Sequence, residues 1–179
     1  MDWLIFLSQL PSNPSSLRVA VWRKMRAAGA LGLQNGTWIF PQNNENEAFL
    51  LELLELVQSQ GASGQIFRMQ PLNEAIEADL LARFQSDREQ EYTELIEGCS
   101  EFLAENEKES AKQKFTFAEL EEAEDDLAKL EAWQAKINKR DFTQSQHAVE
   151  AASLLVECRA AYERFSQSVY DHAGLPQDE

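Results

Sequence analysis

Residues 13–41, NPSSLRVAVWRKMRAAGALGLQNGTWIFP, predict a cationic helix, a glycine-marked turn and an aromatic hairpin. Asn13 is expected to cap a helix whose first residue is Pro14, because asparagine accepts hydrogen bonds from free amides and proline lacks only an amide that would be unpaired. Gly29 is expected to end this helix. The Asn-Gly pair that ends at Gly36 is typical of a tight turn between two short strands.

The segments on either side of this stretch complete a sheet. Residues 3–10 are rich in aromatic and branched side chains and are expected to form a buried first strand. After the hairpin, a helix is expected to begin at Asn44 or Asn46 and to end at Gly61, and residues 64–72 are expected to form the last strand. The order βαββαβ predicts an α+β fold, a ferredoxin-like antiparallel sheet with both helices on one face.

Residues 73–179 predict long amphipathic helices instead of strands. The first is expected to cover residues 73–106, followed by a polar break at residues 108–114. Thr116 and Glu119 are then expected to form the capping box of a second helix. The sequence therefore predicts two domains, a ferredoxin-like domain at residues 1–72 and an acidic helical region at residues 73–179.

The last two helices are expected to form an antiparallel hairpin. A heptad stripe begins at Leu120 and is interrupted by a polar residue at Gln134, and a further helix is expected to restart at Asp141–Thr143 and to end near Gly174. The apolar stripes of all three long helices could close on one another, lie on the open face of the sheet, or pair with a second chain.

The charge is divided unevenly along the chain. The net charge is -15, with five Lys and Arg against five Asp and Glu in residues 1–72 and 11 against 26 in residues 73–179. Overall acidity repels nucleic acid at long range, so that DNA contact would depend on a local basic patch. Such a patch exists, because no acidic residue lies between Asp2 and Glu45.

Four cations and one tryptophan within this acid-free stretch are the candidate ligand-binding or nucleic-acid-binding residues. On a helical wheel Arg18 and Arg26 flank Trp22, whereas Arg23 and Lys24 point elsewhere. In one interpretation Trp22 is a peripheral core residue beside arginine stems. In the other, the residues bind phosphate or another oxyanion, since arginine presents a rigid fork of donors. The full candidate set is Arg18, Trp22, Arg23, Lys24 and Arg26.

The sequence shows none of the motifs of common catalytic sites: no P-loop, dinucleotide fingerprint, nucleophile elbow or HExxH. We therefore expect no enzyme activity, no cofactor and no metal site, although Asp87, Glu91 and Glu94 share a helix face as a weak carboxylate alternative. The segment 83–95 is expected to form structural ion pairs, the alternative being a buried Arg, Glu and Tyr network.

Cys99 and Cys158 are expected to be buried small hydrophobic residues in a reducing compartment, because they have neither redox nor zinc-ligand spacing. The apolar run at residues 3–7 is too short for a secretory leader, and no window has the length needed to span a bilayer. A cytoplasmic protein without membrane association is therefore expected.

Several of these residues together resemble the N-terminal domain of ChrB, the chromate-resistance regulator family. The similarity lies in residues 3–10, in PSSLRVAVWR at residues 14–23, in GA at residues 29–30 with LQ at residues 33–34, and in GTWIFP at residues 36–41. A later segment, DREQEYTEL at residues 87–95, is similar to the helix that follows in that family. The resemblance covers roughly residues 1–100.

The resemblance implies a transcriptional regulator or accessory protein of chromate-resistance operons, whose N-terminal part is associated with DNA binding, with Arg18, Trp22 and Arg23 inside the family motif. ChrB proteins usually continue into a C-terminal domain, and here an acidic helical hairpin is expected in its place, as a standalone form. The βαββαβ order also resembles CRISPR spacer-acquisition nucleases, but Ser8-Gln9-Leu10 stands where those proteins carry an aspartate.

DNA or an oxyanion such as chromate or sulfate is therefore the expected partner. The alternative is a protein-interaction or oligomerisation module in which the helical hairpin pairs with a partner or a second copy. In either case a homo-oligomer, such as a dimer, is expected.

Overall fold

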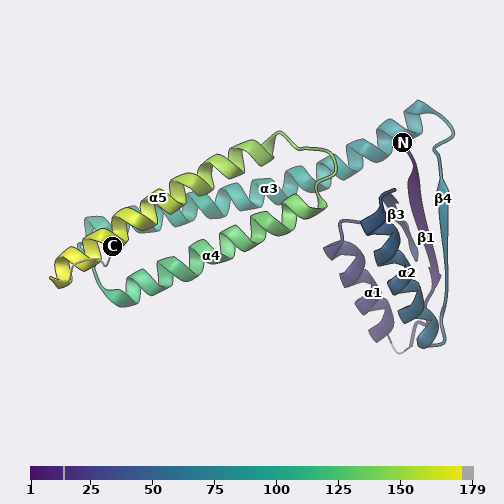
Figure 1. The fold of residues 1–179 in the computed structure, drawn as a ribbon, viewed down its shortest axis with the longest axis horizontal. Helices are drawn as coiled ribbons and strands as arrows, with labels where there is room; N and C mark the ends of the chain where they lie inside the picture. Colours follow the sequence, from purple (N-terminus) through teal and green to yellow (C-terminus); the bar gives the residue numbers. More distant parts are fainter. Residues whose placement is uncertain (14, 175–179) are drawn as a thin grey trace. The chain divides into compact units, whose positions relative to one another are not determined.

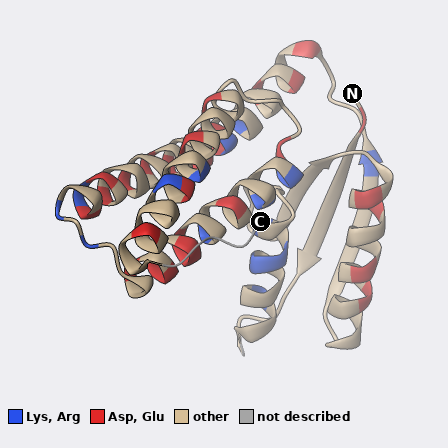
Figure 2. Ribbon diagram, turned by 60° about the vertical axis from the view of Figure 1, so that its left-hand side comes forward, with Lys and Arg blue, Asp and Glu red and all other residues tan. Residues whose placement is uncertain are grey.

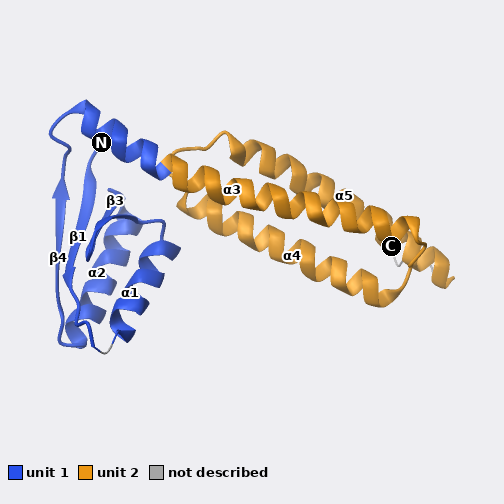
Figure 3. Ribbon diagram, turned by 180° about the vertical axis from the view of Figure 1, so that it is seen from behind, with its two compact units in different colours: residues 1–84 blue, residues 85–179 orange. Residues whose placement is uncertain are grey.

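The computed structural model describes residues 1–13 and 15–174, and the chain divides into two compact units, Met1–Phe84 and Gln85–Glu179 (Figure 3). The first unit contains a four-stranded sheet with two helices, and the second contains long helices (Figure 1). Helix α3 (Glu74–Ala111) contributes residues to both units. The predicted boundary near residue 72 stays a prediction, and each unit is described by itself below.

The first unit confirms the predicted α+β fold. Its elements are β1 (Trp3–Gln9), α1 (Ser16–Ala27), β2 (Leu31–Gln34), β3 (Thr37–Pro41), α2 (Asn44–Ser59) and β4 (Ser63–Met69). The strand order is β2-β3-β1-β4, and every neighbouring pair is antiparallel. This is the arrangement expected of a βαββαβ unit of ferredoxin-like type.

Both helices α1 and α2 pack on one face of the sheet. Successive side chains of β1 alternate between the two faces, so every second side chain points to these helices. Leu4 and Phe6 of β1 are buried against Val21 and Met25 of α1 and against Leu50 of α2. The apolar face of the cationic helix thus points to the sheet, and α1 is held in place by a shared core.

The second face of the sheet is partly covered by the beginning of α3. Trp3 of β1 points to this face and stacks on Phe84 with ring centroids 5.5 Å apart and an interplanar angle of 22°. One residue earlier, a guanidinium nitrogen of Arg83 donates to the backbone carbonyl of Gly32 at 3.1 Å. The sheet unit therefore extends into the first turns of α3, and helices lie on both of its faces.

The predicted cap of α1 is wrong. The N-cap is Ser15, without a side-chain cap hydrogen bond, so Asn13 lies two residues before it, and Pro14 lies outside the described residues. The predicted glycine turns are present: Gly29 follows the helix with φ 82° and Gly36 occupies the hairpin turn with φ 76°. A Cβ atom at Gly36 would lie 2.3 Å from the carbonyl oxygen of Ser8, so this position requires glycine.

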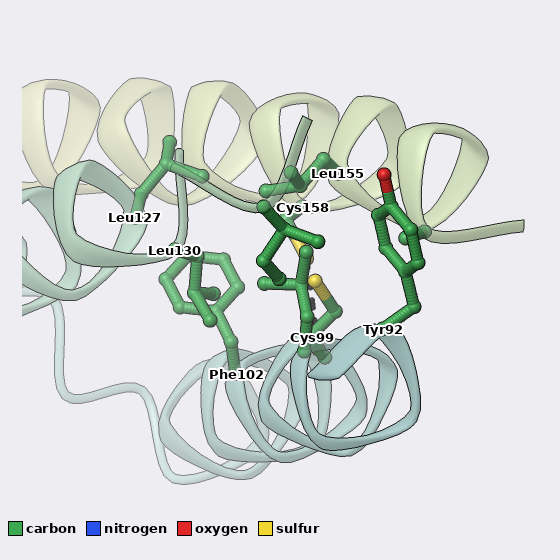
Figure 4. Close-up of a cluster of buried hydrophobic side chains, with 10 residues drawn as sticks. Tyr92, Cys99, Phe102, Leu127, Leu130, Leu155 and Cys158 are labelled. Atoms are coloured by element: carbon green, nitrogen blue, oxygen red, sulfur yellow. Dashed lines mark hydrogen bonds between the residues drawn. The ribbon is translucent and has the colours of Figure 1, made fainter. Parts of the chain in front are cut away.

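The second unit consists of most of α3, α4 (Phe117–Arg140) and α5 (His147–Ala173). Their apolar stripes close on one another, which is the first of the three alternatives left open by the sequence, while the first turns of α3 cover part of the sheet as in the second. Figure 4 shows side chains of the three helices pointing toward a common core that includes Cys99 and Cys158. The labelled members of this core are Tyr92, Cys99, Phe102, Leu127, Leu130, Leu155 and Cys158.

Helix boundaries in the second unit differ from the prediction at two places. Helix α3 continues through the predicted polar break as far as Ala111, and α5 begins at His147, not at Asp141. Asp141 instead caps the connecting loop, because its carboxylate accepts hydrogen bonds from the backbone amides of Thr143 and Ser145, each at 3.0 Å. Half of the predicted capping box is present: the amide of Glu119 donates to the Thr116 hydroxyl at 3.3 Å, whereas the amide of Thr116 donates to the carbonyl of Lys114 at 3.0 Å and not to the Glu119 side chain.

Candidate functional site

Helix α1 presents the predicted cations on the exposed side of a helix whose other side is buried. All five predicted binding residues are exposed, and the Trp22 side chain retains 55% of its accessible surface. Val21 and Met25, between them in sequence, are buried in the sheet core. Figure 2 shows Lys and Arg on α1 without Asp or Glu, so this helix carries only positive charge.

A groove of about 850 Å³ brings together two of the five predicted residues. Arg18 and Trp22 of α1 line the groove together with residues at the ends of strands, namely Gln9 of β1 and Gln34 of β2, and with Trp38 of β3. Arg23, Lys24 and Arg26 do not line this groove. The lining therefore combines one guanidinium, two indole rings and side-chain amides, and it contains no carboxylate.

This combination suits an anion with a flat or apolar part. A guanidinium offers paired donors to phosphate or sulfate-like oxygens, and an indole offers a rigid wall. Arg18 donates to the backbone carbonyl of Ser12 at 3.5 Å, at the long limit of a hydrogen bond, so its side chain remains able to reach a ligand.

The segment 83–95 forms a buried network of Arg88, Glu91 and Tyr92 in the second unit, which is the alternative to simple ion pairs. Arg88 is 3% exposed and lies 3.4 Å from the carboxylate of Glu91, which also accepts a bond from Arg140 at 3.0 Å. One turn away, the Tyr92 hydroxyl contacts Asn138 Oδ1 at 2.9 Å and Asp141 Oδ2 at 3.3 Å. The network joins α3 to the end of α4 and to the following loop.

Two pKa shifts accompany this network. Burial, reinforced by the negative charge of Asp141, raises the pKa of Tyr92 to about 12. Burial would also raise the pKa of Asp141, but hydrogen bonds from Ser145 and Thr143 outweigh it, and the pKa of this carboxyl is lowered. Tyr92 is therefore a neutral donor and Asp141 a charged acceptor, which is a stable structural pairing.

A second groove, of about 460 Å³, lies between α3 and α4 and does not belong to the predicted site. Phe102, Leu130 and Trp133 supply apolar surface, and carboxylates surround it. An acidic run after Thr116 is ordinarily a solvated helix start, but the structure places Glu119, Glu122 and Asp126 in the groove lining. The sequence contains a signal for this acidic lining, because the i, i+3, i+7 spacing of the three residues puts them on one face of the helix.

Metal-binding and thiol chemistry receive no support within residues 1–13 and 15–174. No group of three His, Cys, Asp or Glu side chains there could hold a metal ion, and Glu91 of the carboxylate alternative pairs with arginines instead. Burial raises the pKa of both cysteine thiols, that of Cys158 to about 12, and both are buried as predicted. Over the same residues, no helix combines the length and apolarity that a bilayer crossing needs.

These features define a class of protein: a small α+β chain in which a βαββαβ unit carries one cationic helix and an acidic three-helix unit follows. Residues 18–175 match the family described as Protein ChrB, N-terminal, and the chain belongs to that family. The match extends beyond residue 100 through α4 and α5, so the helical unit is part of the family's region and not a substitute for another domain.

A similar protein is Protein ChrB of Cupriavidus metallidurans, which is 30% identical to this chain over 92 residues. The aligned part covers 51% of this chain and 28% of that protein. The chain therefore spans less than a third of the length of the relative it matches.

Proposed function

We propose that this chain is a ChrB-type regulatory or accessory protein of chromate resistance, and that α1 binds DNA phosphates or an oxyanion such as chromate or sulfate. The single observation that carries the proposal is the exposed, acid-free surface of α1, with Arg18 and Trp22 in a groove that contains no carboxylate. The residues act by binding and orientation, without a catalytic step.

Local geometry makes anion binding compatible with a net charge of -15. Within about 10 Å at ionic strength near 0.1 M, nearby charges dominate over distant ones. Arg18, Arg23 and Lys24 are all exposed on α1, whereas the excess of Asp and Glu lies after residue 72. An anion at α1 is therefore attracted by its immediate neighbours, and the remainder of the chain reduces the affinity.

The test compares Arg18→Ala with Arg23→Ala, as a double variant, against Lys136→Ala with Arg164→Ala, which removes two exposed cations from the second unit. Binding to a labelled DNA duplex is measured by fluorescence anisotropy at low salt, and binding of chromate and of sulfate by calorimetry. We expect the α1 double variant to weaken binding about tenfold or more, a loss of about 1.4 kcal/mol. Absence of binding to all three probes, or equal effects of the two double variants, would refute the proposal.

The second candidate is an interaction or oligomerisation module built on the helical unit. The groove between α3 and α4 favours it, as do Val149 and Val156 of α5, which are 75% and 60% exposed. Deleting residues 115–179 would remove α4 and α5 and uncover Leu95 and Cys99 of α3, so point substitutions are the sharper test.

A further inference from the structure

The groove between α3 and α4 has an apolar floor and an incompletely neutralised acidic rim, and we call it the acidic groove. Its lining consists of Gly98, Glu101, Phe102, Glu105, Asn106, Glu109, Glu119, Glu122, Ala123, Asp126, Lys129, Leu130, Trp133 and Phe165. Six of these fourteen residues are carboxylates and one is a cation. A volume of about 460 Å³ is in the range of pockets that hold a bulky side chain or a small ligand.

Most of the rim carboxylates are already paired within the unit. Glu105 pairs with Lys108 and Asp126 with Lys129, each at 2.7 Å, and Lys114 contacts Glu109 at 2.8 Å. Each of these contacts neutralises one carboxylate, and other carboxylates of the lining remain unneutralised. Among residues 1–13 and 15–174, Glu101 of α3 and Glu122 of α4 have no ion-pair partner, so each wall of the acidic groove keeps an exposed negative charge.

The lining also contains a buried acceptor that lacks a donor. Asn106 is 8% exposed, and its amide nitrogen donates to the carbonyl of Phe102 at 3.0 Å in its own helix. Its Oδ1 atom has no hydrogen-bond partner in the described part of the chain. An unpaired buried acceptor is unfavourable by about 1–3 kcal/mol. The apolar floor and the exposed carboxylates around it suit a partner with an apolar body and positive charge.

Helix α1 has both of these properties on its exposed face. Trp22 offers an apolar indole with one N–H donor, and Val19, one turn earlier, is 41% exposed. Arg18, one turn before the indole, supplies positive charge beside it, the next residue after Trp22 is the exposed Arg23, and the helix has no Asp or Glu. Exposed apolar residues beside cations on a helix are typical of a face that docks into a complementary groove.

The lengths also agree. Helix α1 has 12 residues and is therefore about 18 Å long. The α3 wall runs from Gly98 to Glu109, about 17 Å along the helix axis. The α3 wall therefore matches α1 in length, and a volume of about 460 Å³ is enough for a side chain such as that of Trp22 but not for the helix itself.

We propose that two copies of this chain associate head to tail, with α1 of one copy docked in the acidic groove of the other. Trp22 packs on the apolar floor, and Arg18 and Arg23 face Glu101 and Glu122. Two chains of charge -15 repel each other at long range, and a local contact between opposite charges offsets this repulsion. The inference does not depend on the function proposed above, but it uses the same helix face, so docking and anion binding at α1 exclude each other.

The test is an exchange of charges between the two surfaces of the full chain. One variant carries Arg18→Glu with Arg23→Glu, and the other carries Glu101→Lys with Glu122→Lys. We expect each variant alone to associate at least about tenfold more weakly than the unaltered chain in sedimentation equilibrium. An equimolar mixture of the two should regain association, because the reversed helix meets the reversed groove and the unaltered helix meets the unaltered groove.

Two controls distinguish this contact from a general charge effect. Glu150→Lys with Glu163→Lys makes the same charge change at exposed positions of α5 outside the groove and should leave association within about threefold of the unaltered chain. Trp22→Ala, which changes no charge, should weaken it. Circular dichroism melting confirms that each variant is folded, and association should weaken between ionic strengths of about 0.05 and 0.5 M.

Several results would overturn the inference. The first is an unaltered chain that stays monomeric at all concentrations, which docking of α1 within its own chain would also produce. The second is a mixture of the two variants that does not regain association. The third is an α5 control that weakens association as much as the groove variant does. DNA or chromate binding that depends on Arg18 and Arg23 but survives Glu101→Lys with Glu122→Lys would leave the proposed function intact while this inference fails. An unaltered chain that self-associates but binds neither DNA nor an oxyanion would instead refute the proposed function and leave this inference standing.

Discussion

Replacement of Tyr92 by phenylalanine tests the polar network that joins α3 to the loop after α4. The Tyr92 side chain is 1% exposed, and its hydroxyl contacts Asn138 Oδ1 at 2.9 Å and Asp141 Oδ2 at 3.3 Å. Phenylalanine keeps the ring and its packing and removes only these two contacts. The substitution therefore isolates the hydroxyl from the hydrophobic core around it.

The expected loss of stability near neutral pH is modest. Asp141 keeps its bonds from Thr143 and Ser145, and Asn138 is exposed, so water can replace part of what is lost. A net hydrogen bond contributes about 1 kcal/mol. For a chain of this length that corresponds to a decrease of about 2–4 °C in the melting temperature.

The difference in stability between the two proteins should disappear at high pH. Because the pKa of Tyr92 is 10.0 unperturbed and about 12 in the fold, the neutral phenol stabilises the fold fully below about pH 10, and this contribution is lost as the pH rises through about 12. At about pH 11 the loss reaches roughly 1.4 kcal/mol in the unaltered chain, while phenylalanine has nothing to ionise. The two proteins should then have nearly equal stability.

The assay is urea denaturation followed by far-ultraviolet circular dichroism at a series of pH values, with the difference between the two proteins as the measured quantity. Lysines and cysteines that ionise in this range are common to both proteins and cancel in the difference. Tyr170→Phe, which alters a ring that lies edge-on to Phe117 outside this network, is the control. A difference that stays constant from about pH 8 to about pH 11 would refute the reasoning.

Three further predictions follow from single positions. Gly36→Ala should lower the free energy of unfolding by about 2 kcal/mol or more in thermal melts, because φ is 76° and the new Cβ would lie 2.3 Å from the carbonyl of Ser8; an unchanged melt would contradict the turn geometry. Hydrogen bonds and ion pairs from Lys114 and its neighbours lower the pKa of Glu109 to about 2, so Glu109→Gln should reduce the melting temperature at neutral pH, and the difference should vanish as the pH falls from 4.5 to about 2. Burial raises the pKa of Cys158 to about 12, so a thiol reagent should modify it at neutral pH only after denaturant is added, and rapid modification of the folded chain would contradict its burial.

The sheet unit could be predicted because its signals are local. Alternating apolar residues in β1 and the Asn-Gly turn before Thr37 each act over a few residues, and the strand order follows from the antiparallel connections. The polar break predicted at residues 108–114 comes too early because those residues support the helix: Lys108 and Lys112 each pair with a glutamate three residues before them. A helix boundary thus depends on side-chain pairs that composition alone does not reveal.

The parts of the site that escape prediction depend on residues far apart in sequence. Tyr92 and Asp141 are separated by 49 positions. The apolar stripe of α3 does not indicate whether it packs on the other helices, on the sheet or on a second chain. For the same reason the carboxylates of the acidic groove resemble, in sequence, two unrelated solvated faces. The cations of α1 are identifiable because they share one helix, but their division between the groove wall and the open surface requires coordinates.

The two proposals assign the same cations of α1 to two different partners. One partner is DNA or an oxyanion, and the other is the acidic groove of a second copy. Substitutions in α1 weaken both contacts and cannot separate them. Glu101 and Glu122 can, because they belong only to the groove and lie in the unit that does not contain α1. If self-association shields α1, releasing it by Glu101→Lys with Glu122→Lys should strengthen anion binding more than the matched change at Glu150 and Glu163 does, since both pairs alter the net charge equally and only one frees the helix.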